Sequence, residues 1–128
     1  MEESKSLKYL KALVQCASVP DPEVSAEIIE VLLDKKEISV RDITKELNVS
    51  YPLVLRVVND LTGLGIASTS KIKVEGRGRP RKLVRLNVNK LLSLLGDCRK
   101  SLDEVEKLIR AKAGEGEVSA SVATTQQS

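Results

Sequence analysis

The stretch 39–63 constrains the fold most, because it holds two helical patterns with separate start and stop signals and almost nothing between them. Ser39, with an acidic residue three positions later, is a variant of the capping box that opens a helix. Asn48 is a plausible stop for that helix, and Ser50 is the expected cap of the next one, which runs to Gly63. Two short helices joined by a turn of about three or four residues predict a helix-turn-helix.

Two more helices are expected before this motif. Residues 4–17 carry apolar side chains at helical spacing, with lysines on the opposite side. A second pattern begins after Asp21, which we expect to act as the N-cap of a helix with Pro22 at its first position. This helix should end near Lys36, and the residues 38–40 that follow it favour a β-strand.

Beyond Gly65 the apolar residues alternate, as they do in strands with one buried face. Two such runs flank a basic segment and predict a β-hairpin whose tip extends from Glu75 to Arg81. Pro80 supports this placement, because proline cannot donate to a strand ladder. The apolar residues that share a parity are Ile66, Ile72 and Val74 in the first strand and Val84, Leu86 and Val88 in the second.

From Val88 to Ile109 the spacing becomes helical again, with apolar residues separated alternately by three and four positions. This is the a/d pattern of a heptad repeat, which predicts a helix that packs against another helix. Gly96 interrupts the pattern at a cost of roughly 1 kcal/mol relative to alanine, so a long autonomous coiled coil is not expected. The region after Ala113 has no period and is expected to be disordered.

Positive charge is concentrated in one segment of the chain. The formal net charge is +3, yet the stretch 71–85 alone holds seven basic residues against one acidic residue. Clustering of this kind is typical of proteins that bind polyanions. With two tyrosines, no tryptophan and no phenylalanine, the chain lacks the aromatic platforms on which single strands stack. Duplex DNA is therefore the expected partner.

The centre of this basic segment, 76–82, reads Gly-Arg-Gly-Arg-Pro-Arg-Lys. Arginine is attracted to the narrow minor groove of A·T-rich DNA, and glycine beside it lets the backbone approach the groove walls. The string resembles the AT-hook, a short minor-groove motif. The resemblance implies that Arg77 and Arg79 lie along the groove floor. Arg81 and Lys82 would then reach phosphates, and a solvated basic hairpin tip is the alternative.

Several classes of function are not expected. No apolar run is long enough to cross a membrane and residues 1–18 are too charged for a secretory signal, so we expect a cytoplasmic, nucleoid-associated protein. The chain has no histidine, and Cys16 and Cys98 lie far apart in the sequence, so neither a zinc-finger spacing nor a Cys-His nucleophile can form. We expect no enzymatic activity, metal, cofactor or small-molecule ligand. High charge with few aromatic residues suits a thermophilic archaeon.

The expected elements follow the order helix, helix, turn, helix and basic hairpin, in a mainly α chain with a small β-hairpin (α+β). Residues 24–88 resemble the winged helix-turn-helix transcription regulators of prokaryotes, including the MarR, ArsR and archaeal Lrs14-like groups. The resemblance is most specific in 38–66, where Ser-Val-Arg-Asp-Ile-Thr-Lys-Glu-Leu-Asn-Val-Ser is followed by Val-Val-Asn-Asp-Leu and Gly-Leu-Gly-Ile. It implies a recognition helix from Tyr51 to Thr62 in the major groove and a wing, formed by the hairpin, in the neighbouring minor groove.

With this resemblance the chain divides into four expected parts. These are an N-terminal helix (1–20), a winged-helix DNA-binding domain (21–88), a C-terminal dimerisation helix (89–112) and a disordered tail (113–128).

The outward face of the recognition helix offers few side chains that can read bases. Arg56 can contact guanine and Asn59 adenine, each with roughly 1 to 3 kcal/mol of discrimination. Leu55 can touch thymine methyl groups or pack inward. Affinity is therefore expected to come mainly from charge and the wing, with an A·T preference. The residues expected to contact DNA are Ser50, Tyr51, Leu55, Arg56, Asn59, Lys71, Lys73, Arg77, Gly78, Arg79, Pro80, Arg81 and Lys82.

The terminal helices carry more apolar surface than a winged core of this size covers, which predicts a homodimer. The alternative is that both helices fold back on their own domain. Cys98 is expected to serve as a small buried apolar residue or to meet its symmetry mate. The residues expected at the interface are Leu7, Leu10, Leu13, Val14, Leu91, Leu95, Cys98, Leu102, Val105 and Ile109.

Three functions stay open at this point. A dimeric transcription regulator is favoured, an architectural nucleoid protein is the second choice, and a winged-helix module that binds another protein is the third. The basic cluster in 71–85 argues against the third, because a protein-binding wing has no need of it.

Overall fold

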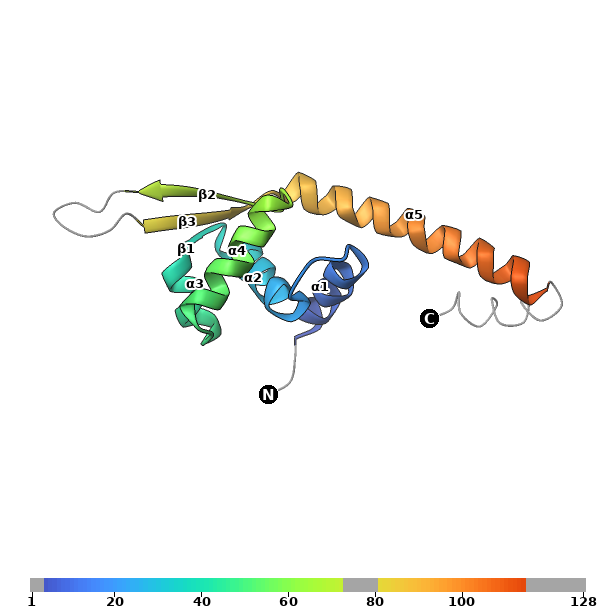
Figure 1. Ribbon diagram of the computed structural model, residues 1–128, viewed down its shortest axis with the longest axis horizontal. Coiled ribbons are helices and arrows are strands. Elements are labelled where there is room, and N and C mark those ends of the chain that lie inside the picture. The colour runs from blue at the N-terminus through green and yellow to red at the C-terminus, as the bar shows by residue number, and fades with distance from the viewer. Residues whose placement is uncertain (1–3, 73–80, 115–128) are drawn as a thin grey trace. The chain divides into compact units, whose positions relative to one another are not determined.

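The structure, a computed structural model, describes residues 4–72 and 81–114. Along these ranges the chain forms five helices and three strands (Figure 1). Their bounds are α1 (Lys5–Cys16), α2 (Pro22–Lys35), β1 (Glu37–Ser39), α3 (Val40–Leu47), α4 (Tyr51–Gly63), β2 (Ala67–Ile72), β3 (Arg81–Leu86) and α5 (Val88–Ala113). The expected mainly α fold with a small β-hairpin is confirmed. The described residues fall into two compact units, one up to Leu95 and one from Gly96 onward.

The predicted helix-turn-helix is formed by α3 and α4, which pack against each other. Ser39 is the N-cap of α3, and its Oγ accepts a hydrogen bond from the backbone N–H of Asp42 at 3.1 Å. Asn48 ends α3 in the left-handed conformation at φ 54°, which asparagine tolerates better than most residues. The start and stop signals in the sequence therefore predicted this motif correctly.

Two of the expected caps work differently from the prediction. Asp21 and Ser50 precede α2 and α4, but neither side chain makes a capping hydrogen bond. Their backbone carbonyls still accept the first helical bonds, as at any N-cap, from the N–H of Ser25 at 2.8 Å and of Val54 at 3.1 Å. A proline in the first turn of each helix removes one of the N–H groups that a capping side chain would otherwise satisfy.

The three strands form one antiparallel sheet in the order β1-β3-β2. Val84 of the central strand is buried, opposite Thr69 of β2 and Ile38 of β1. The predicted parity of the first strand is wrong, because the register that buries Val84 turns Ile72 to the other face, where it is 50% exposed. Arg81, expected at the hairpin tip, is instead the first residue of β3 and pairs with Ile72. The rest of the expected tip lies outside the described residues.

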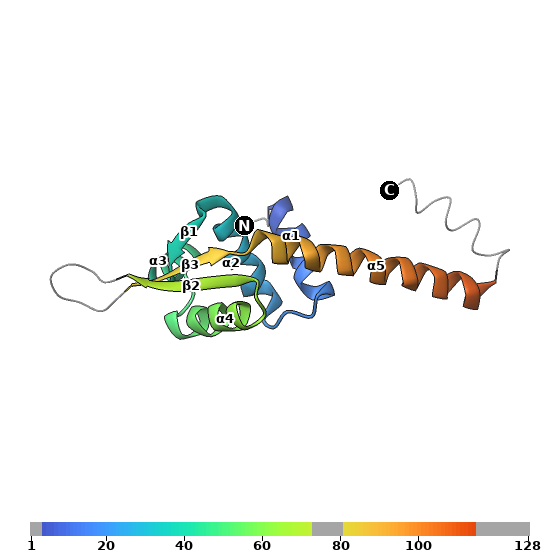
Figure 2. The same ribbon diagram turned by 90° about the horizontal axis from the view of Figure 1, so that it is seen from above.

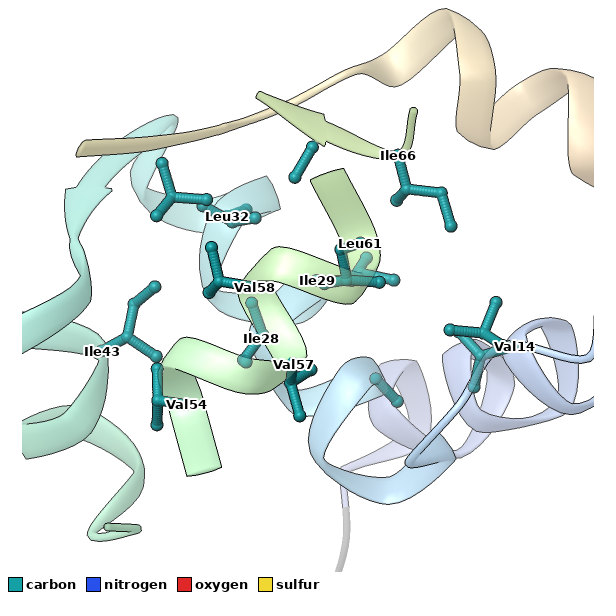
Figure 3. Close-up of a cluster of buried hydrophobic side chains, with 14 of the residues drawn as sticks. Val14, Ile28, Ile29, Leu32, Ile43, Val54, Val57, Val58, Leu61 and Ile66 are labelled. Carbon is teal, nitrogen blue, oxygen red and sulfur yellow. The ribbon is translucent and has the colours of Figure 1, made fainter. Parts of the chain in front are cut away.

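The core is built around the facing sides of α2 and α4, and it extends to α1 and α3 (Figure 3). The buried side chains of the two central helices include Ile28, Ile29 and Leu32 of α2 and Val54, Val57, Val58 and Leu61 of α4. Val14 of α1, Ile43 of α3 and Ile66 before β2 complete the cluster shown. Because an α-helix repeats every ~3.6 residues, burying this stripe of α4 turns one fixed side of the helix outward.

The helix predicted from 88 to 109 is confirmed as part of α5, which is 26 residues long. None of the described helices, α5 included, combines the length and apolar character needed to span a membrane. The segment expected to be disordered lies almost entirely in 115–128, outside the described residues.

The described residues contain no free thiol, because Cys16 and Cys98 are both disulfide-bonded. Cys98 is buried, as expected, but its expected role as an ordinary small apolar side chain is wrong. Two cysteines far apart in the sequence do not form a recognisable disulfide pattern, so nothing in the sequence indicated that they are disulfide-bonded.

The cap of α3 gives a direct test of these local assignments. Replacing Ser39 by Ala should lower the free energy of unfolding by about 1 kcal/mol, because the N–H of Asp42 loses its partner. Ser50→Ala is the matched control, since the Ser50 side chain makes no capping bond, and it should cost less than about 0.5 kcal/mol. Urea unfolding followed by circular dichroism measures both variants. Equal losses would contradict the assignment of Ser39 as the functional cap.

Candidate nucleic-acid interface

Helix α4 and the hairpin formed by β2 and β3 are neighbours within the compact unit up to Leu95. α4 packs on β2, and Figure 2 shows it running alongside the hairpin strands. Side chains on the outward side of α4 and those at the Ile72–Arg81 end of the hairpin can therefore contact the same extended ligand.

The expected DNA-contacting residues of α4 lie mainly on its exposed side. Ser50 at the N-cap, Tyr51 in the first turn, Arg56 and Asn59 are all exposed. Leu55 is only half-buried, but it packs against the core, so the structure supports packing as one of its roles.

A hydrogen bond joins the hairpin to α4. The Nζ of Lys82 on β3 donates to the Oδ1 of Asn59 at 3.0 Å. A bidentate contact to adenine needs both the oxygen and the nitrogen of the asparagine amide, and Lys82 already shares the oxygen and helps to set the orientation of the amide. Asn59 thus directs a positive charge to the boundary between helix and hairpin.

The end of the hairpin near this bond is positively charged. Lys71 lies directly opposite Lys82 in the β2–β3 ladder, an arrangement of like charges that destabilises an antiparallel pair. Over residues 4–72 and 81–114, Lys71, Arg81 and Lys82 form no ion pair. Arg85 on the same strand differs, because its Nε lies 2.6 Å from the Oε2 of Glu37. Arg81 differs too, because it lies on the other face of the ladder and lines a pocket with Glu37, Asp42 and Glu46. The uncompensated charge is therefore that of Lys71 and Lys82, and such charge is typical of an anion-binding surface.

Arg56 is bound by a residue that the sequence did not assign to the site. Its Nη2 donates to both carboxylate oxygens of Asp21, each at 3.0 Å. Asp21 lies in the loop between α1 and α2, 35 positions earlier in the chain. No local pattern predicts such a contact, because it depends on how α2 and α4 pack.

Five of the expected DNA contacts fall in the range 73–80, outside the described residues. They are Lys73, Arg77, Gly78, Arg79 and Pro80. The resemblance of this segment to an AT-hook therefore stays a prediction.

The expected dimer residues separate into two groups by exposure. The first group is covered to a large extent within the chain itself, and its members are Leu7, Leu10, Leu13, Val14, Leu91, Leu95 and Cys98. The second group lies on α5 beyond Gly96, where Leu102, Val105 and Ile109 are each about half exposed or more. Leu108 joins this second group at 56% exposed, and the prediction missed it because it falls outside the strict a/d seam.

Comparison with protein-family models finds no match to this chain. One curated relative, an uncharacterized protein of Methanocaldococcus jannaschii, is 33% identical over 69 residues, or 54% of this chain. The chain spans only 18% of the length of that relative.

Solved structures give closer information on the fold. A possible transcriptional regulator from Methanosarcina mazei Go1 has a TM-score of 0.56 at 16% identity, over 78% of this chain and 88% of the other. A transcriptional regulator homologue from Pyrococcus horikoshii OT3 has a TM-score of 0.54 at 20% identity, over 80% and 98%. A mutant of Staphylococcus aureus MepR bound to an oligodeoxyribonucleotide has a TM-score of 0.52 at 16% identity, over 94% and 84%. The expected winged-helix fold is thus confirmed.

Proposed function

We propose that this protein binds double-stranded DNA through α4 and the wing, and that it acts as a dimeric transcription regulator. The observation that carries the proposal is the positive charge at the junction of the two elements. Lys71 and Lys82 lie there without a carboxylate partner among residues 4–72 and 81–114. The likeness in fold to transcriptional regulators, and to a protein bound to an oligodeoxyribonucleotide, supports the same conclusion.

The junction suits the sugar-phosphate backbone of a duplex. The exposed side of α4 would enter the major groove, and the wing would reach the neighbouring minor groove across one strand of phosphates. Lys82, held by Asn59, lies between these two elements, where it would meet that strand. Lys71, directly opposite, would add a second phosphate contact.

The wing tip would supply the preference for A·T-rich DNA. Arg77 and Arg79 in the Gly-Arg-Gly-Arg-Pro string would insert into a narrow minor groove, where the negative potential is strongest. This part of the proposal rests on the sequence alone.

An architectural DNA-binding role is the second candidate, and one observation favours it. Arg56 and Asn59, the two side chains of α4 best suited to read bases, are both bound by residues of their own chain. When the base-contacting side chains of a recognition helix are already bound within the protein, DNA binding depends more on phosphates and groove shape than on one target sequence.

Two basic residues of β3 test the proposed phosphate contact. Lys82→Ala should weaken duplex binding and reduce the slope of log K against log salt concentration by about 0.9, the value for one phosphate contact. Arg85→Ala is the matched control, because Glu37 already neutralises this side chain, and the slope should change less. Fluorescence anisotropy over a salt series measures both slopes. Equal reductions in the two variants would argue against a phosphate site at the junction, and no duplex binding by the unaltered protein would refute DNA binding itself.

The wing arginines test the A·T preference. The double variant Arg77→Ala/Arg79→Ala should bind A·T-rich and G·C-rich duplexes of equal length with similar affinity, because minor-groove insertion is lost. The unaltered protein should prefer the A·T-rich duplex, and competition titrations compare the two. A preference that survives the double substitution would place its origin outside the wing.

The dimer would form through the exposed apolar stripe of α5, whose members are Leu102, Val105, Leu108 and Ile109. A stripe of large apolar residues at helical spacing is the surface that a helix buries against another element. We propose a second copy of the chain as its partner, because a two-fold dimer would present two recognition helices to one duplex.

A charge placed on this stripe should break the dimer. Val105→Glu should raise the dimer dissociation constant by at least about tenfold, because burying an unpaired carboxylate is costly. Ala111→Glu brings the same charge to an exposed position outside the stripe and should leave dimerisation nearly unchanged. Sedimentation equilibrium measures both constants. A monomeric unaltered protein would contradict the proposed dimer.

A further inference from the structure

The contact between Asp21 and Arg56 has consequences for how the recognition helix reads DNA. A guanidinium group that reads guanine donates from two nitrogens to O6 and N7 of the base. In this structure one terminal nitrogen of Arg56 already donates to both oxygens of the Asp21 carboxylate. The Arg56 side chain is 60% exposed and that of Asp21 34%, so this ion pair is of modest strength, but it orients the guanidinium toward the carboxylate before any base is met.

The backbone at Asp21 is unusual for its sequence context. Its φ of 48° and ψ of 61° are left-handed, a conformation that aspartate and asparagine adopt more readily than most residues, although a following proline disfavours compact conformations. N-capping does not explain this conformation, because the side chain makes no capping bond to α2. What the conformation does provide is a carboxylate placed against α4.

The loop that carries Asp21 is fixed from its buried side. The Oγ of Ser25, which is fully buried, donates to the carbonyl of Pro20 at 2.7 Å, and the N–H of Ser25 donates to the carbonyl of Asp21 at 2.8 Å. Val19 is also buried in the core. The backbone that carries the Asp21 side chain is therefore held in place by packed structure on both sides of the residue.

We propose that Asp21 is a specificity-determining residue, which keeps Arg56 from reading guanine and leaves α4 to bind DNA with little base preference. This inference rests on the DNA-binding function proposed above. Asp21 acts through Arg56 and need not touch DNA itself. Its negative charge also offsets that of Arg56, so the central part of α4 contributes less to phosphate binding than its sequence suggests.

Asp21→Asn is the direct test of this role. Asparagine keeps the size of the side chain and tolerates the left-handed backbone, but it lacks the charge that holds Arg56. The variant should bind duplex DNA roughly threefold to tenfold more tightly than the unaltered protein, as expected when an exposed arginine is released from an ion pair of modest strength. Sequencing of a randomised duplex pool after binding should also reveal a new guanine preference at one position.

Two comparison variants separate this mechanism from a general effect of charge. Glu23→Gln removes an equal charge two residues away, from a carboxylate that lies 3.8 Å from Lys11 rather than against α4. It should change affinity less and add no base preference. The double variant Asp21→Asn/Arg56→Ala should lose both the tighter binding and the guanine preference. If Asp21→Asn acted only by loosening the loop, adding Arg56→Ala would leave both effects in place.

The outcomes are distinct. If the unaltered protein binds duplex DNA and Asp21→Asn behaves like Glu23→Gln, the role of Asp21 is refuted while DNA binding stands. A guanine preference already present in the unaltered protein and lost in Arg56→Ala would also overturn the inference, because Arg56 would then read bases despite Asp21. If neither the unaltered protein nor any variant binds duplex DNA, the proposed function fails and the inference fails with it.

Discussion

The packing of α4 against α2 is the constraint on which the rest of the structure depends. Buried apolar side chains of α4 and of α2 form the layer between them, among them Val58 and Leu61 of α4 and Ile29 of α2 (Figure 3). Because these buried positions follow the helical repeat, they fix the rotation of α4 about its axis. That rotation turns Tyr51, Arg56 and Asn59 outward, and it brings Arg56 within reach of the loop before α2. The interface and its internal contacts thus follow from one hydrophobic contact between two helices.

The charged residues around this layer differ in what neutralises them. Arg56 and Arg85 are each bound by a carboxylate of the same chain, whereas the partner of Lys82 among the described residues is the neutral amide of Asn59. A count of basic residues gives Arg56, Arg85 and Lys82 equal weight. Of these three, Lys82 is the one whose charge is not offset by a carboxylate and can act on a ligand. The chemistry of this surface is therefore set by the pairing of its side chains more than by their number.

The sequence was sufficient for features that depend on local rules. The N-cap of α3 at Ser39 and its end at Asn48 depend on residues a few positions away, and the structure confirms both. Predictions were wrong or absent for features that depend on residues far apart in the sequence. The face of Ile72 follows from the strand register, and the partner of Arg56 lies in another loop. In the candidate site, the exposed positions on α4 were predictable from helical spacing, but their hydrogen-bonding partners were not.

The bond between Lys82 and Asn59 also bears on the shape of ligand that this surface can accept. It joins β3 to α4, two elements that the packing of α4 on β2 already places side by side before any ligand arrives. Such a preformed spacing between α4 and the hairpin suits a duplex with one particular distance between its adjacent grooves. B-form DNA offers a wide major groove beside a narrow minor groove, whereas A-form RNA has a deep, narrow major groove that a helix cannot enter. In the duplex binding proposed above, the fixed placement of α4 beside the hairpin would thus help to distinguish the two kinds of duplex by their geometry, independently of the bases they carry.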